Sequence, residues 1–209
     1  MRTWVILRSA GIGAYVMLFL AIAWGLVSTS GVLGRRVSKA SAVSIHQFMS
    51  TCGLLLLGIH VGALLVDPFM PFGATDIVVP GAASYRPAAT AFGVIAMYAT
   101  VVVLVTSWTR KRIGTTWWRR LHLVAVPAFA LSLAHGIFSG TDSTRPWLWW
   151  MYVVSGSLVV FLVVLRGLTA GHRPDRVARR VAGDRSAAHD VVAAANTPRG
   201  VTTVGADAS

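Results

Sequence analysis

The chain has 209 residues, of which 55% are hydrophobic and only 12% are charged, and its mean hydropathy is +0.66. Because soluble domains carry about 25% charged residues, this composition excludes an ordinary soluble domain and a disordered chain. A single cysteine excludes a disulfide framework and a cysteine-rich zinc or iron–sulfur site. A net charge of +12 is compatible with binding to nucleic acid, and the placement of the charges along the chain decides whether that applies.

Five segments are long and apolar enough to cross a bilayer, which takes about 20 residues of helix. They are residues 11–33, 45–66, 88–108, 121–138 and 147–168. The sequence has no internal repeat and no alternating strand pattern. We therefore predict an all-α integral membrane protein, a bundle of about five transmembrane helices over residues 1–170. Residues 171–209 lack aromatic side chains and are expected to form a disordered tail.

The basic residues indicate how the chain is oriented in the membrane. Lysine and arginine concentrate in the connections 34–44 and 109–120 and at the start of the tail. The other two connections hold only Arg86 and Arg145 as cations. The positive-inside rule then places the tail in the cytoplasm of a multi-pass protein of the plasma (inner) membrane. The same rule explains the net positive charge, so binding to nucleic acid is not needed to account for it. Membrane lipid is then the expected partner of the bundle.

Four of the six histidines fall in only two of the five spans. His46 and His60 lie in the second span, and His122 and His135 lie in the fourth. These spans run parallel, so each is expected to place one imidazole near the cytoplasmic side and one near the outer side. Facing imidazoles at one level are what bis-histidine haem ligation requires. We expect His46 to pair with His122 and His60 to pair with His135, as metal ligands of two stacked haems.

The helical phase of the two spans differs. At about 100° per residue, His46 and His60 lie about 40° apart on their helix, but His122 and His135 lie about 140° apart. We expect a distortion at Pro127, or a non-helical start near His122, to bring the second pair into phase.

Two further groups of residues carry open interpretations. The glycines at 53, 58 and 62 have two interpretations: they make room for a porphyrin, or they allow ordinary close packing of helices. Haem propionates need cationic partners, and the cytoplasmic candidates are Arg119 and Arg120, which also serve as topology charges.

The paired histidine spacings, with the WWRRLH run at Trp117–His122, resemble the ferric reductase-like transmembrane domain superfamily. That superfamily includes ferric reductases, NADPH oxidases and the haem-binding membrane subunit of the bacterial methionine sulfoxide reductase system. The resemblance covers residues 10–170 and implies two b-type haems with the pairing given above. Members often have six spans, whereas five are predicted here. The 39 residues after residue 170 are too short for a nucleotide-binding half.

The expected function is transmembrane electron transfer, as the membrane component of an oxidoreductase. The donor is then a separate flavoprotein or a quinol, and the acceptor is extracytoplasmic. A quinol-oxidising cytochrome b subunit is the nearest alternative, with the 67–87 connection as its quinone pocket. A metal or proton transporter is a weaker alternative, because structural zinc takes four ligands and these histidines come in pairs.

Overall fold

The computed structural model describes residues 2–30, 37–69, 72–171, 182–186 and 188–189. Its helices are α1 (Arg2–Ser30), α2 (Lys39–Leu65), α3 (Ala74–Val78), α4 (Pro87–Trp108), α5 (Arg110–Ile113), α6 (Thr115–His122), α7 (Ala125–Ser139) and α8 (Pro146–Gly171). No strand occurs among these described residues. Five helical stretches are long and apolar enough to span a membrane, with α6 and α7 together forming the fourth. The predicted all-α, multi-pass membrane class is therefore confirmed.

The helices extend beyond the apolar segments that predicted them. α1 begins at Arg2 rather than near residue 11, and α2 begins at Lys39 rather than near residue 45. Hydropathy detects only the part of a helix that matches the hydrocarbon, whereas the backbone stays helical until a cap ends it. For α2 that cap is Ser38, whose side chain accepts a hydrogen bond from the backbone N–H of Ser41. The 67–87 connection contains the short helix α3, which the sequence did not predict.

The fourth span is interrupted, as the histidine phase predicts. α6 ends at His122 and α7 begins at Ala125, with a turn at residues 123–124. Pro127 has no N–H to donate to the carbonyl of Leu123, and the N–H of Val126 bonds to that carbonyl at 3.1 Å instead. The tighter turn rotates α7 relative to α6, so the two histidines of this span need not follow the phase of one straight helix.

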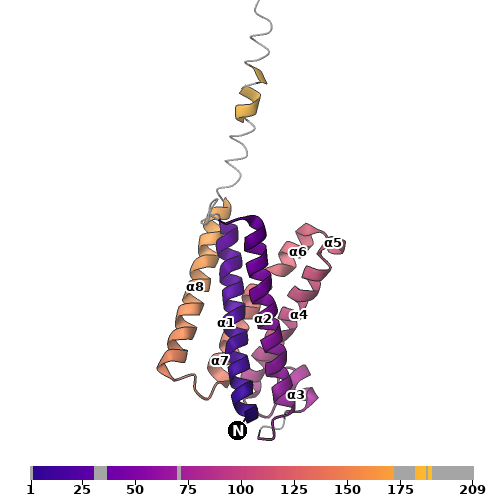
Figure 1. Ribbon diagram of the computed structural model, residues 1–209, viewed down its shortest axis with the longest axis vertical. Coiled ribbons are helices and arrows are strands. Elements are labelled where there is room, and N and C mark those ends of the chain that lie inside the picture. Colours follow the sequence, from indigo (N-terminus) through magenta and orange to yellow (C-terminus); the bar gives the residue numbers. More distant parts are fainter. Residues whose placement is uncertain (1, 31–36, 70–71, 172–181, 187, 190–209) are drawn as a thin grey trace, which may run out of the picture. The chain divides into compact units, whose positions relative to one another are not determined.

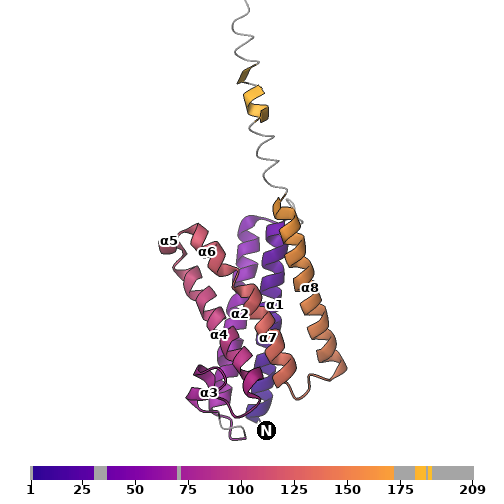
Figure 2. The same cartoon turned by 180° about the vertical axis from the view of Figure 1, so that it is seen from behind.

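Two helix pairs form most of the bundle (Figures 1 and 2). α1 packs along α2, and α4 packs along α7, while α1 also contacts α7. α8 joins them through a core of buried side chains, namely Tyr15, Phe129, Leu148, Tyr152 and Val159. Within that core the hydroxyl groups of Tyr15 and Ser155 are hydrogen-bonded at 2.5 Å. Many large apolar side chains on the outside are exposed, as expected for helices that face lipid.

Truncating Tyr15 is expected to destabilise the bundle much more than removing its hydroxyl group. The Tyr15 ring packs against the rings of Phe129 and Tyr152, with centroids 5.5 and 5.4 Å away. Tyr15→Ala should therefore lower the free energy of unfolding by about 3–5 kcal/mol. Tyr15→Phe should cost about 1 kcal/mol, because only one hydrogen bond is lost. Thermal unfolding in detergent, followed by circular dichroism, measures both. Equal costs for the two variants would contradict a packing role for the ring.

The described chain divides into two compact units, Met1–Arg166 and Gly167–Ser209. In the second unit the described residues are the end of α8 and helical residues at 182–186 and 188–189. The predicted disorder of 171–209 concerns mainly residues outside the described ranges, so it stays a prediction.

Candidate functional site

The structure brings the four membrane histidines together in two pairs. The rings of His46 and His122 have centroids 6.0 Å apart, and those of His60 and His135 have centroids 6.4 Å apart. α2 contributes one ring to each pair, and α6 and α7 contribute the other. Each pair thus joins one ring from α2 with one from the interrupted fourth span, in the combination that the parallel spans predict.

Backbone carbonyl groups orient three of the four imidazoles. The Nδ1 atom of His60 lies 2.9 Å from the carbonyl oxygen of Leu7, and that of His46 lies 2.9 Å from the carbonyl oxygen of Ala21. His135 makes the same bond with Ala89, also at 2.9 Å. Because a carbonyl oxygen only accepts, Nδ1 must carry the proton in each ring. In a neutral ring with this tautomer the Nε2 atom carries no proton, which is the form in which histidine binds a metal.

Glycines in the neighbouring helices allow these rings to approach the backbone. A Cβ atom at Gly11 would lie 2.8 Å from Nδ1 of His60, and one at Gly93 would lie 2.7 Å from Nδ1 of His135. Gly25 has the ring of His46 3.5 Å from its Cβ position. Sequence reasoning missed all three glycines. A signal existed, because Gly11 and Gly25 have the same 14-residue spacing as His46 and His60.

The glycines singled out in the sequence have other surroundings. No atom lies within 4 Å of a Cβ built at Gly58 or Gly62, so neither packs closely on another helix within the described chain. Gly53 lies against Leu18 and Met17 of α1 instead. Ordinary helix packing is therefore supported at Gly53 but not at Gly58 or Gly62 within the described chain, and the porphyrin interpretation stays a prediction.

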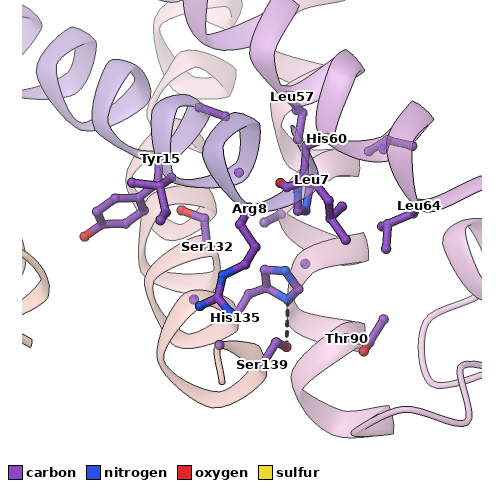
Figure 3. Close-up of a pocket in the computed structure, with 18 of the residues that line it drawn as sticks. Leu7, Arg8, Tyr15, Leu57, His60, Leu64, Thr90, Ser132, His135 and Ser139 are labelled. Carbon is purple, nitrogen blue, oxygen red and sulfur yellow. Dashed lines mark hydrogen bonds between the residues drawn. The ribbon is translucent and has the colours of Figure 1, made fainter. Parts of the chain in front are cut away.

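A cavity of about 270 Å³ surrounds the pair formed by His60 and His135 (Figure 3). Most of its wall is apolar, contributed mainly by α1, α2, α4 and α7. Arg8 also lies at its wall, paired with Asp142 at 2.6 Å and donating to the hydroxyl of Thr141 at 2.6 Å. Sequence analysis assigned no role to the positive charge of Arg8. The salt bridge to Asp142 offsets that charge beside the cavity.

His122 differs from the other three histidines. Its Nδ1 atom is buried and has no hydrogen-bond partner among the residues that the structure describes. Its ring instead lies near the indole of Trp118, with centroids 5.2 Å apart and planes inclined by 37°.

The arginines predicted as propionate partners lie on α6. Arg119 and Arg120 are both exposed, and the guanidinium of Arg120 lies over the ring of Trp117 at 5.4 Å. At the other end of the bundle, Arg86 donates to the carbonyl of Phe138 at 2.5 Å. A role for Arg119 and Arg120 toward a cofactor stays a prediction.

The chemistry of the histidine pairs fits one class of metal group well. No set of three or more histidine, cysteine or acidic side chains within metal-binding reach occurs in the described part of the chain. A metal–imidazole bond is about 2 Å long, so two imidazoles on opposite sides of one metal have ring centres roughly 6 Å apart. The observed separations of 6.0 and 6.4 Å match this value. The pairs therefore suit a planar metal group that supplies its own equatorial ligands, as haem does.

Comparison with known proteins gives a match to a family model. Residues 10–133 match the family model described as ferric reductase like transmembrane component. The match includes three of the four paired histidines, and His135 lies two residues beyond its end. Comparison with curated proteins and with solved structures found no match. Because the family match covers more than half of the 209 residues, the chain belongs to the ferric reductase-like transmembrane family and is a membrane component for electron transfer.

Proposed function

We propose that the chain carries electrons across the membrane through two b-type haems, one held by His46 and His122 and the other by His60 and His135. The observation that carries this proposal is the pair of ring separations, 6.0 and 6.4 Å, with three of the four rings oriented by backbone carbonyl groups. When bound, haem b supplies a one-electron iron couple that apolar side chains lack. The chain's residues supply ligation, spacing and an apolar surrounding.

The spacing of the histidines supports a path across the bilayer. The 14 residues from His46 to His60 span roughly 21 Å of helix at 1.5 Å per residue. That distance is a large part of the hydrocarbon core of about 30 Å. The two levels divide the barrier into shorter steps. At each level the two imidazoles would hold one haem, and the haem would supply the one-electron couple.

The charge distribution supports an orientation for the proposed path. By the positive-inside rule, the basic connections favour a cytoplasmic position, at the plasma membrane, for His46, His122 and the C-terminus. Arg119 and Arg120 lie three and two residues before His122, where they are available to haem propionates on that side. A separate flavoprotein or a quinol would then donate electrons, and an extracytoplasmic acceptor would receive them. Residues 1–170 form the electron-carrying bundle in this proposal, and 171–209 form a cytoplasmic tail.

Haem content and vesicle transfer test the proposal. The full chain, purified in detergent from haem-replete cells, should show b-type reduced-minus-oxidised bands and two haems per chain in a pyridine haemochrome assay. Vesicles containing the protein and loaded with ferricyanide should lose ferricyanide absorbance when dithionite is added outside, faster than protein-free vesicles. His189→Ala, which changes a histidine outside the bundle, is the matched control and should behave as wild type. A folded preparation without haem would overturn the proposal and favour the metal or proton transporter.

One observation favours the quinol alternative. Asp76 and Tyr85, both from the 67–87 connection, line the cavity that also holds His60 and His135. A quinol-oxidising subunit would be reduced rapidly by a short-chain quinol, and Asp76→Asn or Tyr85→Phe would slow that step without lowering haem content. Equal rates in wild type and both variants would exclude this cavity as the quinol site.

A further inference from the structure

The carbonyl groups of α1 that accept hydrogen bonds from histidine follow a spacing that recurs on α4 with one exception. On α1 the accepting carbonyls belong to Leu7 and Ala21, each four residues before a glycine, and they lie 14 residues apart. On α4 the first acceptor, Ala89, again precedes a glycine, Gly93, by four residues. The position 14 residues after Ala89 is Val103, and four residues later stands Ser107 instead of glycine.

At this fourth position, hydroxyl groups of the same helix donate hydrogen bonds to the carbonyl group. Ser107 donates to the carbonyl oxygen of Val103 at 2.7 Å, and Thr106 donates to it at 3.2 Å. The indole N–H of Trp118 in turn donates to the hydroxyl of Ser107 at 3.4 Å. The histidine expected at this level is His122, whose Nδ1 atom is buried and finds no hydrogen-bond partner in the described part of the chain.

We infer that Ser107 and Trp118 are positioning residues that hold His122 by ring contact in place of the backbone hydrogen bond that orients the other three imidazoles. Ser107 occupies the Val103 carbonyl and anchors the indole, and the indole supports the imidazole from one face. This inference rests on the proposed haem-binding function.

The missing hydrogen bond has a consequence for the metal site. An N–H that donates from the far side of a ligating imidazole makes the ring a stronger electron donor, and losing such a partner typically costs about 10–100-fold in metal affinity. A stronger donor favours the ferric state and so lowers the reduction potential. His122 should therefore be the weakest of the four ligands, and the haem it shares with His46 should be held less tightly for that reason.

Ser107→Gly tests the inference by giving the fourth position the residue found at the other three. The variant removes the Ser107 hydroxyl, which is the main competitor for the Val103 carbonyl, and it also removes the Cβ atom beside the backbone. We expect one of the two haem potentials to fall, and the transfer of one haem to apomyoglobin to slow by about 10-fold or more. Potentiometric titration and haem transfer, both on the haem-loaded full chain in detergent, measure these effects.

Matched variants separate positioning from general loosening of the helix. Ser28→Gly makes the same change on α1, where the hydroxyl donates to the carbonyl of Gly25 in its own helix, and should leave both potentials unchanged. Trp118→Phe keeps an aromatic face beside His122 and should retain two haems, whereas Trp118→Leu should speed the loss of one haem. Unchanged potentials and transfer rates in Ser107→Gly, with two haems in the wild type, would overturn the inference. A wild-type chain without haem would instead overturn the proposed function.

Discussion

Replacing His60 with alanine is expected to reduce the haem content from two per chain to one, and replacing His135 should have the same effect. Each haem in the proposed arrangement would be held by one ring from α2 and one from the fourth span, so either loss would leave a single histidine to hold it. The double variant should lose no more haem than each single variant, because the two residues serve the same site. The pyridine haemochrome assay gives the stoichiometry directly.

Combinations across the two levels provide the control for this pairing. His46→Ala together with His60→Ala should remove both haems, although both residues lie on α2. If His60→Ala and His135→Ala each removed one haem and their combination removed both, the two residues would belong to different sites. The pairing proposed from the ring distances would then be wrong.

A single methyl group at Gly93 is expected to abolish binding of the haem held by His60 and His135. The added Cβ would lie 2.7 Å from Nδ1 and 2.8 Å from Cε1 of His135, which is too close for non-bonded atoms. The ring must move away and lose its hydrogen bond to the carbonyl of Ala89. Gly93→Ala should therefore lower the stoichiometry from two haems to one, measured by the same assay on the purified chain.

Helix stability does not account for that loss, because alanine is favoured over glycine within a helix by about 1 kcal/mol. Gly58→Ala is the matched control, since its Cβ would meet no atom within 4 Å, and it should retain both haems. Gly11→Ala, whose Cβ would lie 2.8 Å from Nδ1 of His60, should reproduce the effect of Gly93→Ala. Two haems in both Gly11→Ala and Gly93→Ala would show that the close backbone approach is unnecessary.

The spans and the histidine pairs could be predicted because their signals lie in side-chain chemistry. Long apolar segments with few charges predict five membrane helices, and all five are present. Four histidines at matched depths in parallel spans predict two ring pairs, and the rings meet in those pairs. The interruption of the fourth span followed from the phase of His122 and His135 together with Pro127.

The support of the rings could not be predicted in the same way. The acceptors at Leu7, Ala21 and Ala89 are backbone carbonyl groups, which every residue carries, so the residue type at these positions gives no signal. Gly11 and Gly93 matter because a side chain is absent, and glycine is common in membrane helices for other reasons. Arg8 could not be linked to the site from the sequence, because its partner Asp142 comes from a distant connection.

The hydrogen bonds from α1 to the rings of α2 have a consequence for the entropy of cofactor binding. Fixing a mobile side chain costs up to about 2 kcal/mol of conformational entropy. Because both partners lie in the packed pair of α1 and α2, the hydrogen bonds that fix His46 and His60 are made within that pair. The packed pair of α4 and α7 fixes only His135 in this way. One imidazole of each pair is thus ordered by α1 before haem binds. The entropy cost that remains on binding falls mainly on the imidazole of His122.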